Sequence, residues 1–178
     1  MKLIFLRHGI AEGHFNIDQD ADFMRVLTDE GVNKLNHTFK LFKEAQKKID
    51  VIFTSPLARA VQTAEVFWSH YKDSDLEMMP DLDILDDPIH LVEYISFLPT
   101  DGTYAFVGHD PHLTKVIAAL LALHPEHDFM TLKKGGLCVL EGGMWKGFTM
   151  ELLISPKFLN QVTEKRKNPG RRMTDFKN

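Results

Sequence analysis

The sequence predicts a single α/β domain with a mostly parallel sheet and helices on both faces. Three short apolar runs favour this class, because such runs are typical of strands buried on both sides; they are residues 3–6, 51–54 and 104–108. Each run is followed by a segment with apolar residues at helical spacing. Strands that alternate with helices imply crossover connections, which place helices on both faces of a parallel sheet.

The first apolar run, residues 3–6, leads to an amphipathic helix that begins near Thr28. Thr28 is the expected N-cap, and Asp29 and Glu30 follow it near the positive end of the helix dipole. Steps of three, four or seven residues separate the apolar positions of this helix, which are Val32, Leu35, Phe39, Phe42 and Ile49. They therefore predict one buried helical face.

A polar residue followed by proline marks the start of three later helices. This pair is typical of an N-cap and the first helical position, where proline loses no hydrogen bond. The pairs are Ser55–Pro56, Asp87–Pro88 and Asp110–Pro111. The first and third pairs directly follow predicted strands, as a strand-turn-helix unit requires.

The remaining chain predicts two late strands and a tail. Residues 138–140 and 148–154 read as strands joined by a turn near Gly142–Gly143. Residues 164–178 carry six Lys or Arg, two acids and few apolar groups. We therefore expect a domain over residues 1–163 and a basic, flexible tail over residues 164–178.

Composition and charge exclude several classes of protein. The lone Cys138 cannot form an intramolecular disulfide, which is consistent with a reducing compartment. The apolar run before Arg7 is shorter than a signal-peptide core, and no run approaches the length of a membrane span. The formal net charge is -4, and residues 1–163 alone carry -8. This negative charge disfavours binding of nucleic acid. We expect a cytoplasmic protein with neither nucleic-acid nor membrane partners.

Three predicted strands end in residues that suit phosphate chemistry. Ligands of parallel α/β sheets bind at the carboxyl ends of the strands, so Arg7, His8, Arg59 and His109 are expected to converge. Arginines bind phosphoryl oxygens through charge-assisted hydrogen bonds, and helix N-termini add backbone donors. A histidine with an unprotonated nitrogen can attack phosphorus, and a neighbouring arginine keeps it unprotonated by lowering its pKa.

These segments resemble the motifs of the histidine phosphatase superfamily, whose fold is also called phosphoglycerate mutase-like. The matching residues are Leu6-Arg7-His8-Gly9, Ser55-Pro56-Leu57-Ala58-Arg59-Ala60 with Gln62-Thr63, and Val107-Gly108-His109. A further set is similar to the small SixA-type phosphohistidine phosphatases: Ala11-Glu12, Asp22, Arg25, Leu27-Thr28 and Gly31.

The resemblance implies a covalent mechanism with no metal or other cofactor. His8 would be the phosphorylated nucleophile, and Arg7, Arg59 and His109 would bind the transferred group. Further substrate-binding candidates are Gly9 and Arg25, and the candidate general acids are Asp81 and Asp83.

The implied substrate is phosphohistidine in a protein, such as a phosphorelay domain. Only about fifty residues separate Arg59 from His109, so little chain remains for a cap and an open cleft is expected. Alternatives are a phosphatase of small phosphate monoesters or nucleotides, an inactive phosphate-binding interaction module, and a metal-dependent hydrolase. Ile10, Asp110 and His112 depart from the family pattern and leave the substrate open.

Several histidines lie outside the motif positions and are candidate metal ligands. The closely spaced ones are His112, His124 and His127. No set of histidines and carboxylates near them completes a convincing metal site. We therefore expect these histidines to be exposed to solvent.

Overall fold

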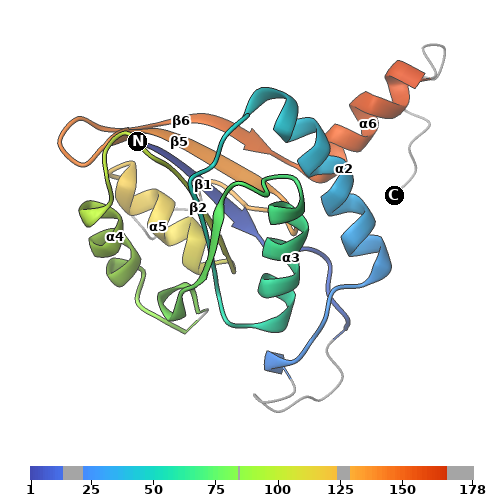
Figure 1. Ribbon diagram of the computed structural model, residues 1–178, viewed down its shortest axis with the longest axis horizontal. Helices are drawn as coiled ribbons and strands as arrows, with labels where there is room; N and C mark the ends of the chain where they lie inside the picture. Colours follow the sequence, from blue (N-terminus) through green and yellow to red (C-terminus); the bar gives the residue numbers. More distant parts are fainter. Residues whose placement is uncertain (14–21, 84, 124–128, 168–178) are drawn as a thin grey trace.

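A six-stranded mixed sheet forms the centre of the fold (Figure 1). The computed structural model describes residues 1–13, 22–83, 85–123 and 129–167. The sheet order is β3-β2-β4-β1-β5-β6, with bounds β1 Lys2–Arg7, β2 Val51–Thr54, β3 Asp75–Met78, β4 Thr103–Gly108, β5 Leu137–Gly143 and β6 Gly147–Ile154. The pairs β3·β2, β2·β4 and β4·β1 are parallel, whereas β5 is antiparallel to β1 and to β6.

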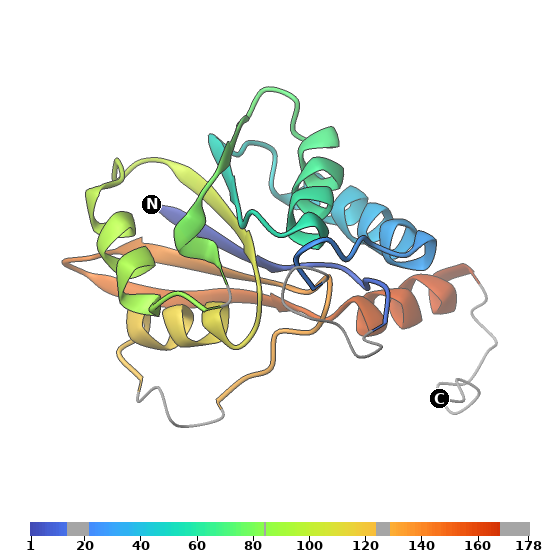
Figure 2. The ribbon, with the colours of Figure 1, turned by 90° about the horizontal axis from the view of Figure 1, so that it is seen from below.

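Helices cover both faces of this sheet, which confirms the predicted architecture (Figure 2). The elements are α2 Asp29–Ala45, α3 Ala58–Ser69, the 3-10 helix η1 Pro80–Leu82, α4 Pro88–Phe97, α5 His112–Leu120 and α6 Pro156–Lys167. Leu3 and Phe5 pack with residues of α4 and α5, whereas Ile4 and Leu6 pack with residues of α2 and α3. The alternation of side chains along β1 therefore builds two separate cores.

Two of the four predicted helix caps are confirmed. Thr28 Oγ1 accepts a hydrogen bond from the Gly31 N–H at 3.0 Å, and Asp87 Oδ1 accepts one from the Ile89 N–H at 3.0 Å. The predictions for Ser55 and Asp110 are wrong, since α3 begins at Ala58 and α5 begins at His112. Both side chains are instead engaged at the end of the sheet where the strands carry the candidate site.

The chain between Arg59 and His109 is part of the domain itself. Its described residues form α3, β3, η1, α4 and β4, so none of them builds a separate cap. The strand β3 lies at the sheet edge with all four residues exposed, and its sequence contains no apolar run that would predict it. The helix α6 crosses the boundary expected at residue 163, and residues 168–178 lie outside the described part. Among the described helices, none is long and apolar enough to span a membrane.

Candidate active site

Three adjacent parallel strands bring the motif residues together. In the sheet, β2, β4 and β1 are neighbours, and their backbone pairing continues past their ends. The His8 N–H donates to Gly108 O at 3.0 Å, and the Ser55 N–H donates to Val107 O at 2.9 Å. His8, Ser55 and His109 therefore leave the same edge of the sheet side by side, as the motifs predicted for the two histidines.

His8 is buried and oriented by its own loop. It is 5% exposed, and its Nδ1 lies 2.7 Å from Gly9 O. Because a carbonyl only accepts, Nδ1 carries the hydrogen and Nε2 keeps its lone pair. Burial, with a smaller contribution from the charges of Arg59 and Arg7, lowers the pKa of His8 to about 3, although the hydrogen bond to Gly9 O acts to raise it. At neutral pH, His8 is an uncharged imidazole whose Nε2 can act as a nucleophile.

The ring of His109 is held beside His8 by the hydroxyl of Ser55. Its ring is fully buried, with its centroid 5.1 Å from that of His8. Its Nε2 lies 2.9 Å from Ser55 Oγ, which itself accepts a hydrogen bond from the Leu57 N–H at 3.4 Å. Burial, with the nearby His8 and Arg59, lowers the pKa of His109 to about 2. A Ser55 hydroxyl that donates to Nε2 leaves the hydrogen of the neutral ring on Nδ1, an atom without a hydrogen-bond partner among the described residues.

Two arginines supply positive charge beside the histidines. Arg59, in the first turn of α3, is 2% exposed and donates from Nη1 to Asp22 O at 2.8 Å. Arg7 donates from Nη1 to Leu132 O at 2.8 Å, and the same atom lies 3.6 Å from Asp110 Oδ2. In both guanidiniums the buried Nε–H has no partner within the described part of the chain. Each arginine is thus fixed in place while one donor stays available.

Asp22 joins Arg59 to Arg25. Its Oδ2 lies 3.1 Å from Arg59 Nη2, and its Oδ1 lies 2.7 Å from Arg25 Nε. Arg25 also donates from Nη1 to Glu12 O at 2.9 Å. Burial acts to raise the pKa of Asp22, but the two arginines outweigh burial and lower it. Arg25, a predicted binding residue, is therefore connected to the site through a carboxylate that the sequence did not single out for a role.

Gly9 serves the packing of the site. Its N–H donates to Thr63 Oγ1 at 3.0 Å, and that hydroxyl donates to Arg59 O at 2.7 Å. A Cβ at Gly9 would lie 2.7 Å from Leu35 Cδ1, so a larger residue there would have to displace the buried Leu35 side chain of α2. The structure thus gives Gly9 the task of holding the His8 loop against α3.

The two candidate general acids occupy different surroundings. Asp83 is close enough to Arg59 and His112 to act on the pKa of both, in the direction of raising it. Asp81 instead acts on His90 and Tyr94. The Leu82 carbonyl lies 3.4 Å from the position of a Cβ on Gly108, which places the loop before Asp83 against the end of β4. Of the two acids, Asp83 is the one beside the candidate site.

The other histidines do not form a metal site in the described part of the chain. His112 is only 2% exposed, so the expectation that it faces solvent is wrong. It opens α5 directly after the end of β4, where the helix packs on the sheet. His124 and His127 lie outside the described residues. Within those residues, no group of three or more His, Cys, Asp and Glu side chains is placed to hold a metal ion.

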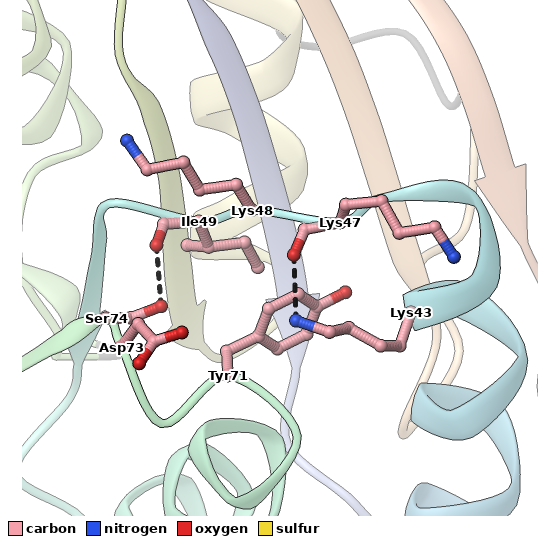
Figure 3. A pocket seen from close by; sticks show the side chains of 7 residues that line it. All are labelled: Lys43, Lys47, Lys48, Ile49, Tyr71, Asp73 and Ser74. Atoms are coloured by element: carbon pink, nitrogen blue, oxygen red, sulfur yellow. Dashed lines mark hydrogen bonds between the residues drawn. The ribbon is translucent and has the colours of Figure 1, made fainter.

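A small cavity lies at the opposite end of the parallel strands (Figure 3). It opens near Ile49 and Ser74, which precede β2 and β3, whereas the candidate site follows the strand ends. Its lining residues are Lys43, Lys47, Lys48, Ile49, Tyr71, Asp73 and Ser74. None of the predicted site residues contributes to it.

Known proteins share both the motifs and the fold of this chain. Residues 3–83 match the family described as histidine phosphatase superfamily (branch 1), and this segment contains Arg7, His8 and Arg59. This match confirms the resemblance to the histidine phosphatase superfamily. Together with the structural neighbours described next, it supports assignment of the chain as a phosphatase.

The similarity extends over most of the chain in four relatives. An uncharacterized protein from Picosynechococcus sp. is 28% identical over 172 residues, covering 89% of this chain and 99% of that protein. The structure of the protein histidine phosphatase SixA complexed with tungstate has a TM-score of 0.75 at 23% identity, covering 89% of this chain and 99% of SixA. Phosphoserine phosphatase from Entamoeba histolytica, in complex with 3-phosphoglyceric acid, has a TM-score of 0.65 at 19% identity, covering 86% and 96%. Phosphoglycerate mutase from Plasmodium falciparum shares the fold as well, with a TM-score of 0.63 at 18% identity, covering 85% of this chain and 88% of that chain, so the fold is phosphoglycerate mutase-like.

Proposed function

We propose that this protein is a metal-independent phosphatase that forms a covalent phosphohistidine on His8 and acts on phosphohistidine in a protein. One observation carries the proposal: buried N–H groups of Arg7, Arg59 and His109 have no partner among the described residues, and all three residues surround His8. An unpartnered buried donor costs free energy, and a bound tetrahedral anion would offset that cost.

The geometry supports a two-step displacement. In the first step, the Nε2 lone pair of His8 attacks phosphorus, the bond to the leaving nitrogen breaks, and that nitrogen takes up one proton from solvent. In the second step, water attacks phosphorus and the N–P bond breaks, with its electrons returning to Nε2. The water proton leaves with phosphate or passes to solvent, and His8 regains its starting state. The low pKa of His8 keeps Nε2 unprotonated for the first step.

In this mechanism, guanidinium and imidazole N–H groups stabilise the negative charge of the phosphoryl group. Negative charge spreads over three oxygens during transfer, and preorganised donors stabilise it without reorganisation. Arg7 Nε, Arg59 Nε and His109 Nδ1 provide such donors from buried, fixed side chains. These groups can fulfil the role that a metal ion has in other phosphatases.

An open site favours a protein substrate, such as a phosphorelay domain. The described chain between Arg59 and His109 builds the sheet and its helices rather than a cap. A histidine on the surface of another protein can approach such a site, whereas a cap would block it. SixA, which shares the fold, is described as a protein histidine phosphatase, and its complex with tungstate shows that a tetrahedral oxyanion binds that relative.

The position of Asp83 favours a second candidate, a phosphatase of small phosphate monoesters. An alkoxide leaving group needs a proton more than an imidazole does, and Asp83 lies near Arg59 at the edge of the site. The fold is also shared by a phosphoserine phosphatase. Turnover of a phosphohistidine protein, compared with a panel of phosphomonoesters, decides between the two substrates.

Trapping of the phosphorylated enzyme tests the mechanism. Wild-type protein, mixed with a ³²P-labelled phosphohistidine domain and quenched in alkali, should retain an acid-labile label. His8→Ala should lose both label and turnover, whereas His90→Ala, a change at an exposed histidine on α4, should retain both. A chelator should leave turnover unchanged. Turnover by His8→Ala, or anion binding without turnover of any substrate, would contradict the proposal.

A further inference from the structure

The segment Leu132–Gly136, which no motif includes, is fastened to the end of β1. The Gly135 N–H donates to both Arg7 O at 3.1 Å and His8 O at 2.9 Å. The Arg7 N–H donates to Gly136 O at 3.1 Å, and Arg7 Nη1 donates to the carbonyl of the buried Leu132. Four hydrogen bonds therefore hold this short segment against the two residues at the start of the first motif.

Lys134 lies in the middle of this segment, and its side chain is exposed. Partial burial, followed by the charges of Arg7, Arg25 and Arg59, lowers the pKa of Lys134. Its own charge contributes to lowering the pKa of His8. The hydrogen bonds of Gly135 and Gly136 hold the backbone next to Lys134 against Arg7 and His8, and the mutual charge effects are consistent with an ammonium near the site.

Lys134 has no carboxylate partner among the described residues. The three arginines of the site are partly neutralised, because Asp22 pairs with Arg25 and Arg59, and Asp110 lies 3.6 Å from Arg7. A cation among other cations raises the electrostatic free energy, and an anion bound between them lowers it.

We propose that Lys134 is a further ligand of the phosphoryl group, binding it from the open side of the site. This inference rests on the proposed function and names a binding residue for it. Asp22 and Asp110 offset two of the three arginine charges, and Asp83 lies near Arg59 as well. A phosphoryl group brings two negative charges, and the Lys134 ammonium adds positive charge to balance them.

The test measures binding of inorganic phosphate and of orthovanadate by calorimetry, without turnover. Lys134→Gln should weaken both by about tenfold, the effect expected for one charge-assisted hydrogen bond. Lys134→Arg, which keeps the charge, should restore most of the affinity. Lys133→Gln is the matched control, because it removes an exposed charge from the same segment, and it should bind as wild type does.

The charge argument also predicts a salt dependence. The difference between wild type and Lys134→Gln should shrink as ionic strength rises, since the ammonium is exposed and screened. Equal affinity of Lys134→Gln and wild type at low salt, or an equal loss in Lys133→Gln, would overturn the inference.

The two proposals can fail separately. Failure to trap a phosphorylated His8, with Lys134→Gln still weakening anion binding, would remove the covalent mechanism and leave the Lys134 inference standing. A trapped phosphorylated His8, with unchanged anion binding in Lys134→Gln, would support the covalent mechanism and overturn the proposed role of Lys134.

Discussion

The hydroxyl of Ser55 is the hydrogen-bond partner of His109 Nε2, so Ser55→Ala is an informative change. Both side chains are fully buried and 2.9 Å apart, and the ring has no other hydrogen-bond partner in the described part of the chain. Without the hydroxyl, His109 Nε2 is left buried with no hydrogen bond. The tautomer with hydrogen on Nδ1, the one that donates into the site, then loses its support.

The size of the effect follows from these contacts. Removing one partner of a buried hydrogen bond costs about 1–3 kcal/mol, because the remaining group stays desolvated and unpaired. We therefore expect Ser55→Ala to lower the free energy of unfolding by about 2 kcal/mol. Loss of the Nδ1–H donor should also weaken vanadate binding by about tenfold, as for one hydrogen bond to a charged group.

Three measurements check this prediction. Urea unfolding gives the stability, calorimetry gives the vanadate affinity, and ¹⁵N NMR of the imidazole reports the tautomer of His109 directly. Ser69→Ala is the matched control: Ser69 is exposed near the end of α3, and its removal should change stability by less than about 0.5 kcal/mol. A Ser55→Ala protein with wild-type stability, affinity and tautomer would refute the reasoning.

Two further predictions concern pH and the proton donor. The pKa values of His8 and His109 fall from 6.5 to about 3 and about 2 on folding, so the unfolded chain binds more protons below pH 6.5. The free energy of unfolding should therefore be highest above pH 6.5. It should fall as the pH decreases, by about 2 kcal/mol for each histidine at pH 5. Urea unfolding in phosphate-free buffer checks this, and a flat profile between pH 7 and pH 5 would contradict it. Asp83→Asn should slow phosphomonoester turnover by at least about tenfold, as expected for loss of a general acid, and Asp81→Asn should not. Equal rates in the two variants, compared at saturating substrate, would remove Asp83 from this role.

The strands that carry the site could be predicted because burial on both faces leaves a clear pattern. In β1, β2 and β4, every position except the ends must be apolar, and the sequence shows short uninterrupted runs there. The strand β3 has no such run, since its four residues are exposed at the sheet edge. The central strands could thus be predicted from the apolar runs that burial requires, rather than from strand propensity.

The motif residues could be predicted, but most of their supporting contacts could not. Ser55–Pro56 has the pattern of a helix cap, yet the hydroxyl binds His109, which is 54 residues away. Asp22 reaches Arg59 across 37 residues. Lys134 interacts electrostatically with Arg7 across an even longer separation in the sequence. A lysine followed by two glycines is not a local pattern that would predict this interaction. These contacts depend on how the strands are ordered in the sheet, which local patterns do not encode.

The placement of the site on β1, β4 and β2 has a consequence for local unfolding. These strands are paired on both sides, and β1 and β4 are the two central strands. Amide hydrogens there exchange only when much of the sheet opens, whereas the edge strands β3 and β6 can open alone. The backbone that positions His8 and His109 should thus remain closed while either edge frays. The edges of the sheet can therefore accept insertions or new partners without moving the groups proposed to handle phosphate.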